Sequence, residues 1–144
     1  MTFIWTSNTD SGVYSDALSV RFAVFIDEQK VPKELEVDEF ETQAFHLVLY
    51  KDKKAMGTAR VLNIGAQTYK IQRVAVLKEA RGKGFGAAIM KEIERYLQMS
   101  DAKSLTLGAQ IHAVPFYKKL GYTVVGEEFM DAGIPHLMMT KSLI

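Results

Sequence analysis

The fold of this chain is decided by one stretch, Ile71-Gln-Arg-Val-Ala-Val76, then Leu77-Lys-Glu-Ala80, then Arg81-Gly-Lys-Gly-Phe-Gly-Ala87, then an apolar-periodic segment that runs to Gln98. Its first part alternates β-branched residues with polar or small ones, which indicates a strand. From the loop onward an apolar residue recurs at every fourth position: Phe85, Ile89, Ile93 and Leu97. This spacing gives a helix one apolar stripe. The stretch therefore predicts a strand, a glycine-rich loop and a helix.

The loop has the composition of a phosphate site. Gly82, Gly84 and Gly86 alternate with other residues, and the missing Cβ atoms let successive backbone N–H groups point into one concavity. Arg81 and Lys83 flank this concavity, and the positive end of the helix dipole faces the same space. We therefore expect the loop to hold a diphosphate.

Two other interpretations of the loop remain open. Glycine-rich turns between strands and helices are common, so Arg81 and Lys83 could simply be solvated. The run Gly82-x-Gly84-x-x-Ala87 also fits the loose dinucleotide fingerprint, although the Walker pattern is absent. That fingerprint wants an acidic residue at the end of the next strand. Because that strand is expected to end in Ala109-Gln110, the nicotinamide hypothesis weakens.

Two sequence blocks resemble the GCN5-related N-acetyltransferase (GNAT) family. The family's loop pattern, [Q/R]-x-x-G-x-[G/A], is matched by Arg81, Gly84 and Gly86. The segment Leu107–Tyr122 is similar to the family's second block, which ends in Tyr-x-Lys-Leu-Gly-[Phe/Tyr]. Both blocks occur in the family's order. The resemblance implies that the chain uses acetyl-CoA and releases CoA as a product.

The resemblance also implies which residues contact the coenzyme. The central strand and the loop would supply backbone amides, and the second block would supply side chains: Val74, Ala75, Val76, Arg81, Gly82, Lys83, Gly84, Phe85, Gly86, Ala87, Gln110, Phe116 and Tyr117. A backbone N–H of Val74 or Val76 would polarise the thioester carbonyl. Gln110 departs from the asparagine that many family members carry at this position.

Composition indicates one domain and excludes several classes of partner. The 144 residues, 48% of them hydrophobic, are enough for one core, so we expect a single domain over residues 1–144. The formal charge of +1 gives no long-range attraction to nucleic acid or to anionic membranes. There is no cysteine, which rules out disulfides and thiolate metal sites, and we expect no metal centre. The chain has no signal-like N-terminus and no long apolar run, so we expect a cytoplasmic protein.

The order of expected elements is α+β. Strands are predicted at Thr2–Thr6, Ala44–Tyr50, Ala55–Asn63, Thr68–Val76, Ser104–Gln110, Tyr122–Phe129 and His136–Leu143. Helices are predicted at Tyr14–Ile26, at Gly84–Gln98 and from Pro115 until Gly121 ends it. The resemblance implies the GNAT fold, a mixed, mostly antiparallel twisted sheet of about six or seven strands flanked by about four helices.

The acidic segment Glu28–Glu41 supports two interpretations. Its composition is typical of an exposed, solvated loop. Its pattern, with Arg21 before it and Glu36 and Asp38 within it, nevertheless resembles the acceptor-side segment of a subset of small bacterial acetyltransferases. A similar pattern occurs in acyl-homoserine-lactone synthases. We assign the acceptor contacts to Arg21, Phe25, Glu28, Gln29 and Arg73, and we expect the carboxylates to suit a cationic, amine-bearing acceptor.

Acetyl transfer to an amine needs a base, because an alkylamine with a pKa near 10.4 is almost wholly protonated at neutral pH. We name His136 and Glu28 as catalytic candidates, with His112 and Asp38 as further candidates. The resemblance implies that Tyr117 donates a hydrogen bond to the coenzyme sulfur. His46, between Phe45 and Leu47, is expected to be structural.

These features predict an acetyl-CoA-dependent N-acetyltransferase that acts on a primary amine of a small molecule by direct attack. One alternative is a protein or peptide N-acetyltransferase. Another is a non-catalytic CoA-binding sensor domain. An acyl-homoserine-lactone synthase is disfavoured because Trp5 is the only tryptophan. The oligomeric state stays open, and a homodimer is one possibility because small members of the family often dimerise.

Overall fold

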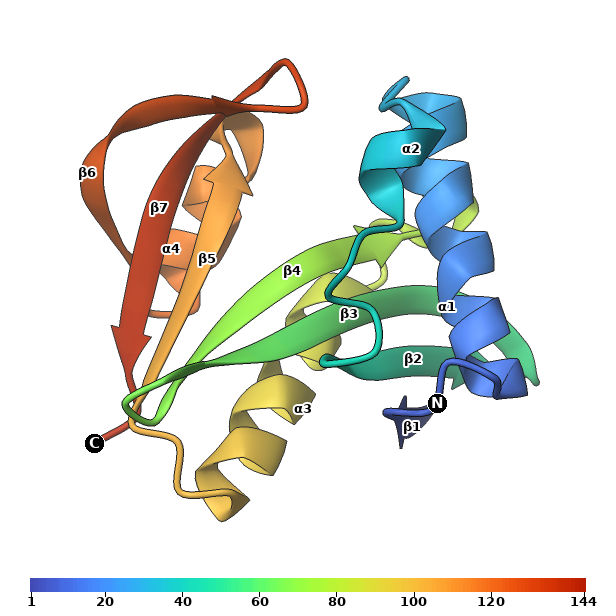
Figure 1. Ribbon diagram of the computed structural model, residues 1–144, viewed down its shortest axis with the longest axis horizontal. Helices are drawn as coiled ribbons and strands as arrows, with labels where there is room; N and C mark the ends of the chain where they lie inside the picture. The colour runs from blue at the N-terminus through green and yellow to red at the C-terminus, as the bar shows by residue number, and fades with distance from the viewer.

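A seven-stranded sheet organises the chain in this computed structural model, which describes residues 1–144 (Figure 1). The strands are β1 (Thr2–Thr6), β2 (Phe45–Lys51), β3 (Lys54–Gly65), β4 (Thr68–Val76), β5 (Ser104–Gln110), β6 (Thr123–Asp131) and β7 (Ile134–Ser142). Their order in the sheet is β1-β2-β3-β4-β5-β7-β6, and only β4 and β5 pair in parallel. This confirms the predicted mostly antiparallel sheet.

Four α-helices and several shorter turns flank the sheet. They are α1 (Gly12–Arg21), the π-helix η1 (Phe22–Glu28), α2 (Lys33–Glu36), the 3₁₀ turn η2 (Lys78–Ala80), α3 (Phe85–Met99), the 3₁₀ turn η3 (Ile111–Ala113) and α4 (Val114–Lys119). The helix α1 begins where the Ser11 hydroxyl accepts a hydrogen bond from the Tyr14 N–H at 3.2 Å. It lies on the opposite face of the sheet from α3 (Figure 1).

The apolar stripe of α3 forms the centre of the core. Ile89 and Ile93 are fully buried against β3, β4 and β5, where Val61 and Leu105 belong to the same cluster. On the other face, Val20 and Val24 pack against Ala75 of β4. The central strand is therefore covered on both sides, which fixes its place between the two helices.

The parallel pair β4 and β5 separates part of the way along. Pairing extends only from Thr68–Ser104 to Ile71–Leu107, and beyond that point the strands diverge (Figure 1). Just after the last pair, Arg73 adopts φ +57° and the register with β3 shifts. A left-handed non-glycine residue within a strand marks a bulge. Residues 72–76 thus have no strand partner on the side facing β5.

Two helical features differ from the sequence-based expectations. The first helix becomes the π-helix η1 at Phe22 and continues to Glu28, past the expected end at Ile26, and the short helix α2 lies within the acidic segment. The last strand, β7, inserts between β5 and β6, because its hydrogen bonds to β5 cover the edge that β5 would otherwise expose. No helix is long and apolar enough to cross a membrane.

Candidate active site

A cavity of about 1030 Å³ opens where β4 and β5 diverge. Its floor is formed by β4 and β5 on the two sides of the gap. Its walls are formed by η1, the segment around α2 and the β6–β7 hairpin. Four expected acceptor-contact residues line it: Phe25, Glu28, Gln29 and Arg73. Of the expected catalytic residues, Tyr117 and His136 line it as well.

A second pocket of about 370 Å³ adjoins this cavity at the glycine-rich loop. It is lined by most of the residues that we expect to contact the coenzyme: Val74, Ala75, Val76, Arg81, Gly82, Gly84, Phe85, Gly86, Ala87, Phe116 and Tyr117. Gly84 stands at φ +78° before α3 and leaves the first N–H groups of the helix without intrahelical partners. The pocket therefore combines open N–H groups with the positive end of a helix dipole.

Tyr117 stands between the two spaces, since it lines both. The residue is buried, with 8% of its surface exposed. Its ring packs edge-on against that of Phe116, with 5.0 Å between the ring centroids. Burial raises the pKa of the Tyr117 phenol to about 12. The hydroxyl makes no hydrogen bond within the protein. It is not fully buried either, since the only fully buried side-chain nitrogen or oxygen without a partner is His46 Nδ1. Tyr117 thus presents a protonated, uncommitted donor.

His136 presents an uncommitted acceptor to the same cavity. Its Nδ1 lies 2.7 Å from the Ile134 carbonyl oxygen. A carbonyl only accepts, so in the neutral ring Nδ1 carries the proton and Nε2 keeps a lone pair. Phe129 stacks on the ring at 5.7 Å and fixes its plane. This is the tautomer that a general base requires.

Two contacts bridge the gap between η1 and the coenzyme-side elements. Glu28 accepts two hydrogen bonds from Arg81, at 2.6 Å each, and Gln110 donates to the Gln29 side chain at 2.8 Å. The hydrogen bonds from Arg81 lower the pKa of Glu28, which makes its carboxylate a weaker base. In this arrangement Glu28 is better placed to hold Arg81 than to accept a proton.

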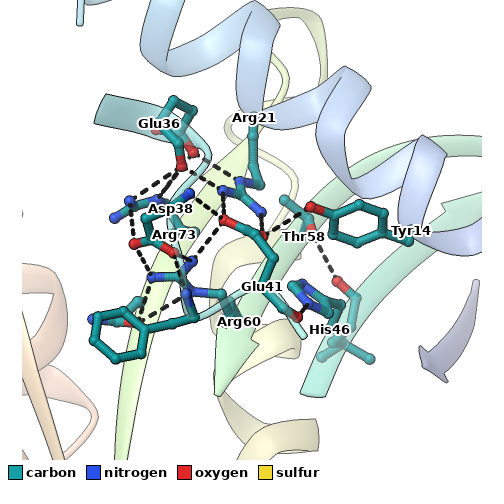
Figure 2. Close-up of polar contacts among 12 residues, drawn as sticks. Tyr14, Arg21, Glu36, Asp38, Glu41, His46, Thr58, Arg60 and Arg73 are labelled. Atoms are coloured by element: carbon teal, nitrogen blue, oxygen red, sulfur yellow. Dashed lines mark hydrogen bonds and ion pairs between the residues drawn. The ribbon is translucent and has the colours of Figure 1, made fainter. Parts of the chain in front are cut away.

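Three carboxylates of the acidic segment, those of Glu36, Asp38 and Glu41, are paired with arginines and are not free (Figure 2). Glu36 pairs with Arg21 at 2.7 Å and with Arg73 at 3.0 Å. Glu41 pairs with Arg21 at 2.8 Å. The solvated-loop interpretation is wrong for these two glutamates, which are 3% and 5% exposed.

Arg60 and Asp38 complete this ion cluster. The guanidinium of Arg60 pairs with Asp38 and Glu41, both at 2.8 Å. Tyr14 donates to Glu41 at 3.0 Å, and His46 contacts the Glu41 carbonyl oxygen at 2.9 Å. Burial would raise the pKa of Glu41, but hydrogen bonds from Arg21 and its charge outweigh burial and lower it to about 2. We use the term ion cluster for Arg21, Glu36, Asp38, Glu41, Arg60 and Arg73.

Several expected site residues lie elsewhere. Arg21 is 1% exposed and does not line the cavity, because the carboxylates of Glu36 and Glu41 hold it in the ion cluster. Lys83 is exposed and lines neither space. His112 is exposed at the cavity edge in η3, and His46 lies in the core as expected. Sequence reasoning missed Arg60, for which its place in an apolar strand was the only signal.

The comparisons with known proteins identify the family. The family model described as Acetyltransferase (GNAT) domain matches residues 8–143. The chain belongs to the GNAT family. A Bacillus subtilis relative, described as Uncharacterized N-acetyltransferase YjcF, is 46% identical over 127 residues, which cover 88% of this chain and 90% of that protein.

Solved GNAT structures agree with the fold. An Acyl-CoA N-acyltransferase from Pseudomonas aeruginosa is 26% identical, with a TM-score of 0.86 and 97% and 98% of the two chains covered. An aminoglycoside 6'-N-acetyltransferase complexed with coenzyme A is 14% identical, with a TM-score of 0.75 and 100% and 98% covered, and shares the fold. Acyl transfer is therefore the activity class of this GNAT chain.

Proposed function

We propose that this chain transfers an acetyl group from acetyl-CoA to a primary amine of a small molecule by direct attack. The observation that carries the proposal is the position of Tyr117, an unpaired donor that lines both the loop pocket and the larger cavity. A two-substrate reaction needs such a junction, where the thioester from one side meets the amine from the other.

The residues of the smaller pocket suit coenzyme A. The open edge of β4 at residues 72–76 offers backbone groups to an extended arm, and the N-terminus of α3 offers N–H groups to phosphates. Arg81 adds a guanidinium next to this helix end. When bound, acetyl-CoA supplies a thioester whose acyl carbon is open to an amine. The aminoglycoside 6'-N-acetyltransferase, which shares the fold, is complexed with coenzyme A, and this supports the choice.

Different residues of the chain would act on the acyl oxygen, on the amine proton and on the sulfur. A backbone N–H of Val74 or Val76 would hydrogen-bond to the acyl oxygen. His136 Nε2 would take the proton of the amine, directly or through a water. Tyr117 would donate to the sulfur as negative charge develops there. Full proton transfer from a phenol of pKa about 12 to a thiolate near 8.5 is uphill by about 5 kcal/mol, so Tyr117 acts by hydrogen bonding.

Release of free thiol from acetyl-CoA tests the proposal. We expect thiol release only when the protein and a primary alkylamine are both present, with one N-acetylated amine formed per thiol. Thiol release that needs no amine would indicate hydrolysis, and the absence of release with every amine, despite coenzyme binding, would support a sensor domain. Efficient acetylation of peptides but not of small amines would move the acceptor class to peptides.

A further inference from the structure

Strand β4, on the floor of the larger cavity, carries a cation with a free nitrogen. Arg73 is 20% exposed and lines the cavity. Its polar contacts, to Glu36, Leu35 and Asp38, are all made by Nε and Nη2. Nη1 donates no hydrogen bond and is not among the buried unpaired atoms. One edge of the guanidinium is therefore held rigidly while Nη1 remains open.

The carboxylates beside Arg73, those of Glu36 and Asp38, are already paired with arginines. Asp38 accepts from Arg60 through both oxygens and from Arg73 and the Phe40 N–H as well. Glu36 shares Oε2 between two arginines. Its Oε1 accepts no hydrogen bond, but the residue is only 3% exposed. The ion cluster as a whole contains three arginines and three carboxylates, so it carries no net charge.

A second cation on the same strand is not neutralised. Lys70 of β4 lines the cavity and forms no ion pair. The remaining unpaired carboxylate of the lining, Asp131, lies exposed at the end of the β6–β7 hairpin. Near the coenzyme pocket, by contrast, Glu28 is available to attract an ammonium whenever Arg81 turns to a phosphate. Along β4 the cavity thus carries Arg73 with its open nitrogen and the unpaired Lys70, whereas Glu28 is neutralised by Arg81 in this structure.

From this distribution we infer that the acceptor carries a carboxylate as well as the amine, and that Arg73 Nη1 binds this carboxylate. The inference rests on the proposed function and narrows its acceptor class. It adds an anionic group to the acceptor, whereas the sequence led us to expect that the carboxylates of the acidic segment suit a cationic, amine-bearing acceptor. The left-handed φ of +57° at Arg73 agrees with it, since strained backbone tends to persist where a side chain has a task at the site.

Three acceptors with the same carbon chain test the inference: 4-aminobutyrate, butylamine and 1,4-diaminobutane. A charge-assisted hydrogen bond corresponds to a preference of about tenfold to hundredfold. We expect kcat/KM for 4-aminobutyrate to exceed that for butylamine by this factor, with the diamine no better than butylamine. This ranking needs no variant. Equal rates for the three acceptors, or a preference for the diamine, would overturn the inference while leaving the acetyltransferase function intact.

The substitution Arg73→Asn assigns the preference to the residue. Asparagine tolerates left-handed φ values, and Glu36 and Asp38 each keep one arginine partner, Arg21 and Arg60, so we expect the fold to persist. The preference should fall to about one and be partly restored in Arg73→Lys. Arg95→Asn, on the exposed face of α3, is the matched control and should retain the wild-type preference for 4-aminobutyrate over butylamine.

A binding measurement separates the inference from turnover. In the presence of CoA, titration calorimetry should show that 4-aminobutyrate binds more tightly to the wild type than to Arg73→Asn. Binding that does not depend on Arg73 would contradict the assignment. Failure of all three amines to release thiol would overturn the proposed function together with the inference.

Discussion

At the scale of single residues, the site depends on groups that the fold leaves without partners. Tyr117 keeps its proton because burial raises the pKa of its phenol to about 12, and no residue of the protein accepts its hydrogen bond. His136 has the opposite role, because its contact with the Ile134 carbonyl leaves Nε2 as the acceptor. The pair supplies one donor and one acceptor to the same cavity.

Tyr117→Phe tests the donor. Loss of one hydrogen bond to a developing charge costs about 10²-fold in rate, so we expect kcat to fall by about that factor while the melting temperature changes little. Steady-state thiol release measures the effect. Tyr96→Phe, which removes a hydroxyl from the stacked pair with Trp5, is the control. Unchanged kcat in Tyr117→Phe would remove the residue from the mechanism.

His136→Gln tests the acceptor. Removing a general base typically costs about 10²-fold or more, so we expect kcat to fall by at least that factor at pH 7. Because the base acts on a protonated amine, part of the activity should return at higher pH, where the free amine is more abundant. The control is His112→Gln, at the cavity edge. A variant with full activity at pH 7 would transfer the role to another group.

At the scale of elements, the π-helix η1 and the glycine-rich loop are joined through Glu28 and Arg81. This pair is solvent-accessible, with side chains 35% and 41% exposed, so it contributes little to stability. Glu28 nevertheless accepts the hydrogen bonds of the Arg81 guanidinium, which a coenzyme phosphate would otherwise accept. Coenzyme binding and release of Glu28 toward the cavity are therefore expected to occur together.

Glu28→Gln tests this coupling. The substitution removes the competing carboxylate, and the free energy of an exposed pair corresponds to a change of about two- to fivefold. We expect the Kd for CoA, measured by calorimetry, to decrease by that factor. Glu34→Gln, exposed on α2, should leave the Kd as it is. A weaker affinity in Glu28→Gln would mean that Arg81 needs Glu28 to hold its position.

The ion cluster ties α1, α2 and β3 to the central strand, and its stability depends on pH through Glu41. The pKa of Glu41 is lowered from 4.5 to about 2 in the folded protein. A lowered folded-state pKa contributes stability above the unfolded value, and that contribution is lost as pH falls from about 4.5 toward 2.

Urea unfolding of wild type and Glu41→Gln between pH 7 and pH 2 measures this contribution. At pH 7 we expect the variant to be less stable by about 3 kcal/mol. The difference in unfolding free energy should shrink toward pH 2, where about half of the Glu41 carboxyls of the wild type are protonated. A difference that stays constant over this range would show that the carboxylate charge is not what stabilises the cluster.

At the scale of the whole molecule, sequence patterns predicted what depends on local order. The alternation from Ile71 to Val76, the stripe from Phe85 to Leu97 and the glycines between them placed the central strand, α3 and the loop correctly. The ion cluster was not predictable in this way. Arg21, Arg60 and Arg73 lie far apart along the chain, and only tertiary packing decides whether an acidic segment meets them or meets water.

The insertion of β7 between β5 and β6 was likewise not predicted, since a hairpin pattern in the sequence does not decide which of its two strands borders β5. This order places His136 opposite Gln110, next to the gap in the sheet. The long-range pairing thus brings a residue of the last strand to a site whose other residues come from η1, β4, the glycine-rich loop and α4.

The central claim, that the pocket at the glycine-rich loop binds coenzyme A, is tested most directly by thermal unfolding with acetyl-CoA, CoA and NAD in parallel. A ligand at 100 times its Kd adds about 2.7 kcal/mol to the folded state, which should raise the melting temperature by about 5 to 10 °C. We predict this rise with acetyl-CoA and with CoA and none with NAD. A rise with NAD alone, or no rise with either coenzyme A form, would contradict the account.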